Sequence, residues 1–316
     1  MSRVVIGGSS GFIGRHLQQK YRAAGREVVT ISRSGADLAW SDQDGIDAAI
    51  DGAGLVVGLA GKSVSCRYTP ENRAQIFSSR LDTTASLSGA ISRASAPPPL
   101  WINSSTATIY RHAEDRPMTE ADGEIGTGFS VEVAKAWERE LFAAELPATR
   151  RVALRTAIVL GDGGVLGPLR VLARLGLGGT QRDGWWPVTR ARREAGTAHL
   201  PGARGGRQRF SWIHVDDVLG IIDFLEQHSE LDGPVNASSP NPVDNAGFMA
   251  SLRRALGVRF GPPTPRWMLE LGAIGIRTET ELILKSRWVL PGRLTEAGYA
   301  IRHPDLDEAL RSSLPN

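Results

Sequence analysis

Three glycines at a spacing of three are the first residues whose arrangement could do chemistry. Gly8, Gly11 and Gly14 follow an apolar run at 3–7 and precede a stretch with helical periodicity at about 12–24. Between a strand and a helix, such glycines allow a tight turn, a close approach of the backbone to a pyrophosphate, and close packing of helix on strand. The N-terminus of the helix adds unpaired N–H groups and a partial positive charge. The pattern therefore predicts a dinucleotide site at Gly8, Ser9, Ser10, Gly11, Phe12, Ile13 and Gly14.

The end of the next predicted strand, 27–31, indicates which dinucleotide fits. Ser32 and Arg33 stand where a site for NAD would present Asp or Glu to the ribose 2′-hydroxyl. A hydroxyl and a guanidinium can instead form charge-assisted hydrogen bonds with a 2′-phosphate, so we expect NADP(H), with an ordinary surface arginine as the alternative. After a third predicted strand, 55–59, small residues would let the backbone lie against the cofactor. The residues expected there are Leu59, Ala60, Gly61 and Lys62.

Short β-branched runs alternate with longer helical patterns through the first half of the chain. This rhythm predicts parallel strands joined by right-handed crossovers. The predicted strands are 3–7, 27–31, 55–59 and 100–104, with a helix at about 70–93 before the last of them and one more strand-like run at 151–161.

The composition changes near Gly161, where glycine-rich segments begin. The stretch from about 178 to 208 has no sustained apolar period and predicts a long loop, after which a strand and a helix follow at 209–227. We therefore expect an α/β protein with a doubly wound parallel Rossmann sheet and a smaller C-terminal α/β substrate lobe. The expected NADP-binding domain is 1–165, with 209–240 returning to it, and the smaller lobe comprises 166–208 and 241–316.

Composition and charge exclude several classes of protein. The 316 residues are 41% apolar and 22% charged, which is typical of soluble globular proteins. The single cysteine, Cys66, excludes an internal disulfide framework and suits a reducing cytoplasm. No run approaches the ~20 apolar residues of a membrane span, and no signal peptide is expected. The arginine cluster at 189–196 lacks interleaved aromatic residues, so we expect a solvated loop, a small-molecule substrate and no nucleic-acid partner.

With these landmarks, the chain resembles an extended short-chain dehydrogenase/reductase, and within it the atypical epimerase-family SDR39U1/YfcH-like group. The motifs that carry the resemblance are "GGSSGFIG", "LAGKSV", "RYTPENRAQIFSSRLDTT", "INSSTATIY", "KAWERE", "FSWIHVDD" and the terminal "SRWVLPGRLTEAGYAIRHPDLDEAL". The terminal segment is the most specific, because generic Rossmann proteins do not share it. The resemblance implies a fold like that of sugar-nucleotide epimerases and binding of NADP(H).

The chain departs from the wider superfamily at its catalytic helix, predicted at about 129–145. The Tyr-x-x-x-Lys positions hold Phe129 and Val133, and none of the four tyrosines has a lysine four residues later. Lys135 lies two residues past Val133, about 200° around a helix, so it faces away from that site. The segment from about 180 to 206 is also longer than the loop that the resemblance implies. It could form a lid or be mostly disordered.

Few residues remain that could carry chemistry. The resemblance implies that Ser104 or Ser105 matches the catalytic serine, while Arg80 falls where an asparagine is expected. Arg80 could clamp an anionic substrate or stabilise an oxyanion, or form a surface salt bridge, and we expect Arg80 and Ser104 beside the cofactor. Tyr110 could line the pocket or serve in packing.

His214 has a pKa suited to acid–base work, with Asp216 and Asp217 following it, or it is a buried structural histidine. These residues are too few for a metal site, so no metal is expected.

These observations favour an NADP(H)-dependent oxidoreductase or epimerase-like enzyme with Ser105, Ser104, Arg80 and His214 as catalytic candidates. Its substrate would be a small carbonyl or hydroxyl compound, or one resembling a nucleotide sugar. The alternative is a non-catalytic NADP(H)-binding sensor or scaffold. By analogy, the two helices at 70–93 and 129–145 make a homodimer possible beside a monomer.

Overall fold

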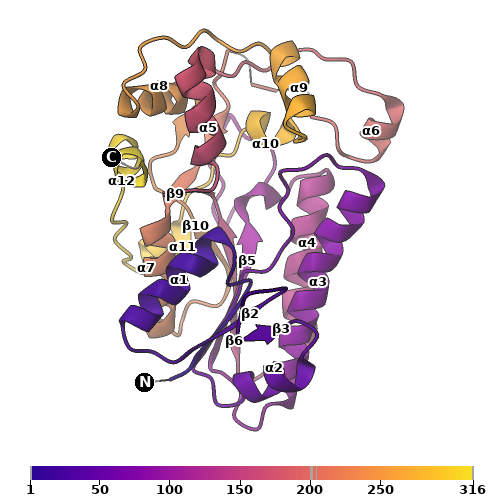
Figure 1. The fold of residues 1–316 in the computed structure, drawn as a ribbon, viewed down its shortest axis with the longest axis vertical. Helices are drawn as coiled ribbons and strands as arrows, with labels where there is room; N and C mark the ends of the chain where they lie inside the picture. Colours follow the sequence, from indigo (N-terminus) through magenta and orange to yellow (C-terminus); the bar gives the residue numbers. More distant parts are fainter. Residues whose placement is uncertain (1, 200–201, 204, 315–316) are drawn as a thin grey trace.

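Seven parallel strands form the central sheet of the computed structural model, which describes residues 2–199, 202–203 and 205–314 (Figure 1). The strand order is β10-β6-β5-β4-β1-β2-β3, so the order reverses between β1 and β4, as in a doubly wound fold. The apolar runs form its middle strands and are buried on both faces. The strands are β1 (Val4–Gly7), β2 (Val28–Ser32), β3 (Leu38–Ala39), β4 (Leu55–Gly58), β5 (Leu100–Thr106), β6 (Arg150–Thr156) and β10 (Gly233–Ala237).

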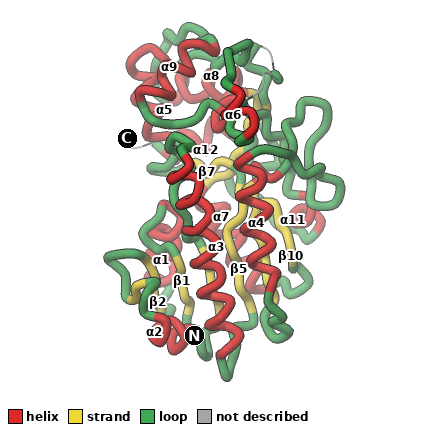
Figure 2. The backbone as a smooth tube through the Cα atoms, turned by 90° about the vertical axis from the view of Figure 1, so that its right-hand side faces the viewer, coloured by secondary structure: helices red, strands yellow, loops and turns green. Residues whose placement is uncertain are grey.

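Helices cover both faces of this sheet. Helices α1 and α7 pack together on one face, and α2, α3 and α4 lie on the other, where α3 and α4 run side by side (Figure 2). Helix α3 begins at Pro70 because a proline fits the first turn and the Thr69 hydroxyl accepts from Asn72 N–H. The bounds are α1 (Phe12–Ala23), α2 (Gln43–Ile50), α3 (Pro70–Arg93), α4 (Phe129–Ala143) and α7 (Val215–Gln227).

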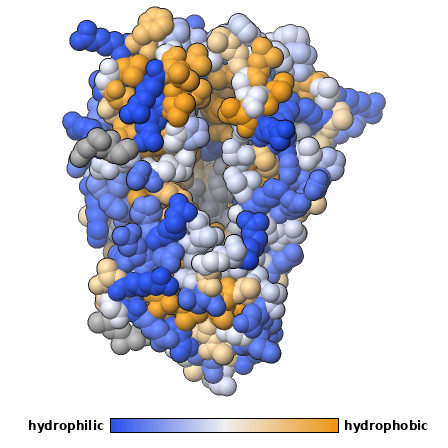
Figure 3. Space-filling view, in the orientation of Figure 1, coloured by the Kyte–Doolittle hydropathy of each residue, from blue (hydrophilic) through white to orange (hydrophobic). Residues whose placement is uncertain are grey.

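A second group of elements lies beyond the end of β5, in the upper half of Figure 1. These elements surround two small sheets, in which β8 pairs antiparallel with β11 and β7 pairs parallel with β9. Figure 3, in the same orientation, shows a hollow in the middle of this face, between this group and the central sheet. The remaining elements are η1 (Ala107–Ile109), β7 (Ile158–Leu160), α5 (Leu166–Leu172), η2 (Ala173–Leu177), α6 (Arg190–Glu194), β8 (Arg209–Phe210), β9 (Trp212–His214), β11 (Val243–Asp244), α8 (Asn245–Ala255), α9 (Arg266–Gly275), α10 (Glu281–Leu284), α11 (Gly292–Glu296) and α12 (Leu306–Ser313).

The strand-like run predicted at 151–161 forms two strands, β6 and β7, because the chain changes sheets at Ala157. Ala157 N–H donates to Ala237 O, at the end of β10 in the central sheet, whereas Ile158 N–H donates to Ser211 O beside β9. Arg155 and Thr156 interrupt the apolar run directly before this point, but the residues on both sides favour strands, so the residue types did not show that the chain changes sheets there.

The predicted loop at 178–208 is confirmed over most of its described residues, with α6 as its only regular element there. Leu200, Pro201 and Arg204 of this segment lie outside the described residues. Within the described part of the chain, no helix has the length and apolar character that crossing a membrane requires.

Candidate functional site

The glycine turn joins β1 to α1 and lies against the loop that follows β4. Gly8 has φ +80°, and a Cβ on it would come within 2.6 Å of Ala60 N. A Cβ on Gly14 would come within 2.7 Å of Gly8 O. Helix α1 begins after Gly11 without a capping side chain and without an acidic residue in its first turn. Its first N–H groups therefore suit an anion such as a diphosphate.

The end of β2 presents Ser32 and Arg33 beside this turn. The Ser32 hydroxyl donates to Ser34 O at 2.5 Å and also accepts from Ser34 N–H, so it shapes the turn. Arg33 is exposed and has no hydrogen bond or ion pair with any described residue. Its guanidinium is therefore available to a ligand on this edge.

Arg80 of α3 supports the loop after β4. Its guanidinium donates to Lys62 O at 3.1 Å and to Ile76 O at 2.9 Å, and lies 4.9 Å from the Trp137 ring. Burial lowers the pKa of Arg80 to about 10. The surface salt bridge considered from the sequence is wrong, because Arg80 is buried and pairs with no acid in the described chain. The Lys62 ammonium itself contacts Asn72 and Gln75 at the start of α3.

Ser105 belongs to a buried polar network. Its hydroxyl donates to Glu138 Oε1 at 2.5 Å, and Arg155 donates to both oxygens of Glu138 at 2.8 and 2.7 Å. Arg155 also donates to the Tyr110 hydroxyl at 2.8 Å, which donates to Asn236 Oδ1 at 3.0 Å. The network connects side chains of β5, β6, α4 and β10 near the carboxyl ends of these strands. Tyr110 is accordingly buried and fixed by packing and hydrogen bonds.

Four further polar residues gather at the end of β5, and motif reasoning missed their meeting. Thr106, the last residue of β5, donates its hydroxyl to Thr108 Oγ1 at 3.1 Å, and Arg287 Nε donates to the same oxygen at 3.1 Å. Lys285 Nζ donates to Thr108 O at 2.9 Å. Both cations are buried, and neither pairs with a carboxylate among the described residues. Burial lowers the pKa of Lys285 to about 8 and also lowers the pKa of Arg287.

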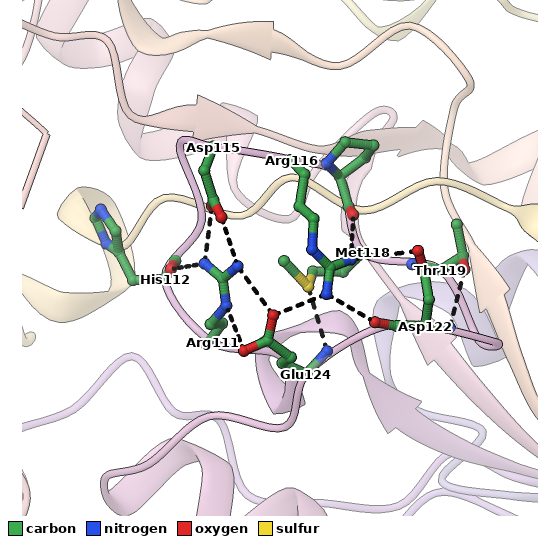
Figure 4. A network of polar contacts seen from close by, with 9 residues as sticks. Arg111, His112, Asp115, Arg116, Met118, Thr119, Asp122 and Glu124 are labelled. Atoms are coloured by element: carbon green, nitrogen blue, oxygen red, sulfur yellow. Dashed lines mark hydrogen bonds and ion pairs between the residues drawn. The ribbon is translucent and has the colours of Figure 1, made fainter.

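The position of this C-terminal segment depends on the loop after η1. Figure 4 shows that Arg111 binds Asp115 and Glu124, while Arg116 binds Asp122 and the same Glu124. Each exposed pair contributes little alone, but the shared Glu124 joins them into a network that limits the motion of the loop.

This loop in turn anchors the segment that carries Lys285 and Arg287. Met118 N–H donates to Trp288 O at 2.7 Å, and Leu290 N–H donates to Met118 O at 3.0 Å. The only sequence signal was the terminal motif "SRWVLPGRL", which does not show where in the fold it returns.

The start of α4 is apolar where a catalytic tyrosine and lysine would stand. Phe129 and Val133 are buried with Tyr68 and Ile76 in one apolar cluster. The Tyr68 and Phe129 rings lie 4.6 Å apart, and the Tyr68 hydroxyl is buried without a hydrogen-bond partner among the described residues. Lys135 points elsewhere and pairs with Glu132, as its helical position predicts.

His214 lies outside this group of residues. Its Nδ1 accepts from Asp216 N–H and caps α7, its ring lies 4.1 Å from the His303 ring, and its Nε2 contacts Ser312. Burial and the neighbouring His303 lower the pKa of His214. None of these contacts involves the end of β5. Ligand atoms of His214, Asp216 and His303 lie within 4.8 Å of one another, but His214 Nδ1 already serves as the helix cap.

The segment after Gly178 packs against the start of α4. Phe129 N–H donates to Gly196 O at 2.9 Å, and Asp183 is buried against His199 and Arg266. Arg192, one of the clustered arginines, pairs with the buried Glu279 at 2.6 Å. The described residues of this segment therefore make specific contacts with the start of α4, with α9 and with Glu279.

Fold and site together define a dinucleotide-binding protein of the doubly wound type: a glycine turn after β1, an uncapped helix behind it, and polar groups at the end of β5. The chain belongs to the NAD dependent epimerase/dehydratase family, whose model matches residues 4–237. Residues 264–313 match a domain of unknown function (DUF1731).

Relatives and solved structures confirm the resemblance stated from the sequence. Epimerase family protein SDR39U1 of Homo sapiens is 31% identical over 98% of this chain and 98% of its own. Epimerase family protein YfhF of Bacillus subtilis is 28% identical over 97% of this chain and 96% of its own. The crystal structure of human SDR39U1 with NADPH matches with a TM-score of 0.82 and 29% identity, covering 98% of each chain. A UDP-glucose 4-epimerase of Thermotoga maritima, at 16% identity and a TM-score of 0.74 over 98% of this chain and 97% of its own, shares the fold.

Proposed function

We propose that the chain binds NADP(H), with the diphosphate at the N-terminus of α1. The observation that carries this proposal is the fit of the turn. Gly8 leaves no room for a Cβ against Ala60, and the first N–H groups of α1 lack both a capping side chain and an acidic neighbour. Arg33, exposed beside the turn, would pair with the 2′-phosphate. The relative crystallised with NADPH supports this choice of cofactor.

The proposed activity is that of an oxidoreductase or epimerase-like enzyme on a small carbonyl or hydroxyl compound, or one resembling a nucleotide sugar. The nicotinamide would supply or accept the hydride. Ser104 and Thr106 alternate with Ser105 along β5, so their side chains leave the opposite face of the strand from the Glu138 network. These two hydroxyls would bind the reacting oxygen, whereas Ser105 would hold Glu138 and thereby the strand.

Arg80 would act through the loop that it supports. Its two hydrogen bonds fix Lys62 O and, with it, the backbone expected to lie against the cofactor. His214 would have a structural role at the start of α7, because its contacts are with that helix and the C-terminal tail. The lone Cys66 is compatible with a reducing compartment.

A second candidate function is a sensor or scaffold that binds NADP(H) without catalysis. One observation favours it: Phe129 and Val133 fill the Tyr-x-x-x-Lys positions with packed apolar side chains. Such side chains can neither donate a proton nor hold a ribose by charge.

One assay separates the two functions. NADPH oxidation would be followed by absorbance, and epimerised product by chromatography with NADP⁺ present, over a panel of simple carbonyl compounds and nucleotide sugars, with NADPH affinity measured in parallel by calorimetry. Turnover with any member supports the enzyme. Tight NADPH binding with no turnover across the panel contradicts the enzyme and supports the sensor.

A further inference from the structure

One buried phenol at the candidate site has no hydrogen-bond partner. Tyr68 is 8% exposed, and its hydroxyl oxygen is buried without a donor or acceptor among the described residues. A buried hydroxyl that is left unpaired costs free energy, so its retention calls for a ligand that completes the hydrogen bond. The ring is held by the Phe129 ring at 4.6 Å, and the Tyr68 backbone N–H donates to Glu279 Oε1 at 3.0 Å.

The contacts of Tyr68 place its phenol beside the position from which the superfamily's tyrosine is missing. Phe129, which occupies that position on α4, is the residue whose ring Tyr68 touches. The phenol also lies close enough to Arg80 and Arg287 to oppose the lowering of their pKa values by burial. Arg80 supports the loop after β4, and Arg287 contacts Thr108 just after β5. The geometric contacts of Tyr68, with Phe129 at the start of α4 and with Glu279, place the ring on the side of the site where the superfamily's tyrosine would stand.

We propose that Tyr68 donates the hydrogen bond and the proton to the substrate oxygen, so that the phenol comes from the loop before α3 instead of from α4. This inference rests on the proposed function. In the reduction, the carbonyl carbon gains a C–H bond from the hydride of NADPH and the C=O π bond breaks. The oxygen takes the Tyr68 proton, and solvent returns a proton to the phenolate while NADP⁺ is left as the oxidised product.

The surroundings keep the phenol protonated and ready to donate. Burial raises the pKa of Tyr68, and the nearby Glu281 raises it further, whereas the neighbouring Ser130 hydroxyl and Arg287 oppose this. Arg287 is thus placed to stabilise the phenolate that forms on proton transfer. No other tyrosine could serve: Tyr110 is bound to Arg155 and Asn236, Tyr21 contacts Asp223 of α7, and Tyr299 donates to Asp217 O.

The test removes a single oxygen atom. Tyr68→Phe is expected to keep the NADPH affinity of the wild type and nearly all of its stability, because among the described residues the hydroxyl has only the neighbouring Ser130 and no hydrogen bond of good geometry, and to lower kcat roughly 100-fold or more. Tyr299→Phe is the matched control, since it removes a phenol that is hydrogen-bonded far from the end of β5; its kcat should equal that of the wild type. If Tyr68→Phe turns over as fast as the wild type, the inference is overturned while the proposed function stands. If the wild type turns over nothing, both are overturned.

A second readout does not depend on turnover. The chain has only four tyrosines, so labelling their ring Cζ with carbon-13 gives four resonances, and the one lost in Tyr68→Phe is that of Tyr68. Saturating NADP⁺ should move the Tyr68 resonance and leave that of Tyr299 in place. A Tyr68 resonance that does not move would overturn the inference, because the phenol would then lie away from the nicotinamide.

Discussion

Lys285 should destabilise the folded protein at neutral pH, so its removal should stabilise the chain. Lys285 is 7% exposed, and its ammonium donates to Thr108 O at 2.9 Å and has no carboxylate partner among the described residues. Burial lowers its pKa from 10.5 to about 8. Below about pH 8 the folded chain therefore carries a buried, unpaired positive charge.

The free-energy cost of burying the charged Lys285 follows from the shift of its pKa. Lowering the pKa from 10.5 to about 8 corresponds to about 3 kcal/mol, since a tenfold change in proton affinity is worth about 1.4 kcal/mol. Replacing Lys285 by methionine also removes the bond to Thr108 O, at a cost of about 1 kcal/mol. The net expectation is that Lys285→Met raises the free energy of unfolding by about 2 kcal/mol at pH 7.

The contribution of Lys285 to the free energy of unfolding should change with pH in a defined direction. Between about pH 8 and 10.5 the unfolded chain keeps the lysine proton that the folded chain has lost, so the stability contributed by this group rises with pH. Urea unfolding of the wild type and of Lys285→Met at pH 7 and at pH 10 should show the gap between them shrinking or reversing at the higher pH. Lys135→Met, which removes an exposed lysine paired with Glu132, is the control and should change stability by less than about 1 kcal/mol at both values. A Lys285→Met protein that is less stable than the wild type at pH 7, with a gap independent of pH, would refute the reasoning.

Three other substitutions test the cofactor turn and the buried network. Gly8→Ala should abolish measurable NADPH binding in calorimetry, because its Cβ would meet Ala60 N at 2.6 Å; binding at the wild-type affinity would contradict the close approach. Arg33→Glu should weaken NADPH binding roughly tenfold or more and should not weaken NADH binding, since only NADPH carries the 2′-phosphate. An equal loss of affinity for both cofactors would show that Arg33 does not bind the 2′-phosphate. Glu138→Gln should lower the free energy of unfolding by about 3 kcal/mol or more in urea, because Arg155 would lose a buried carboxylate bound through two nitrogens; a loss below about 1 kcal/mol would show that the pair contributes little.

Local patterns were sufficient for the fold around the glycine turn. The glycine spacing and the β-branched runs predicted the turn, the parallel strands and the doubly wound order, because the residues involved are neighbours in sequence. Periodicity also placed Phe129 and Val133 correctly on one face of α4 and Lys135 on another.

The substrate half depends on contacts between distant parts of the chain. Thr108 and Lys285 meet across 177 residues of sequence, and Tyr68 is fixed by Glu279 across 211. No local pattern marks either meeting, so the sequence directed attention to Ser105 and His214 instead. Both have the right residue type, but the structure uses Ser105 to hold Glu138 and His214 to cap α7. The residue type alone could not show that these polar groups are already bound.

The most direct test of the account is a crystal structure of the chain with NADPH. The account predicts the diphosphate on the N–H groups at the start of α1, the 2′-phosphate against Arg33, and the nicotinamide C4 at the end of β5, with space for a substrate beside Thr106 and on the side of Tyr68. A cofactor whose C4 face is filled by protein side chains, or whose nicotinamide lies away from the end of β5, would contradict it.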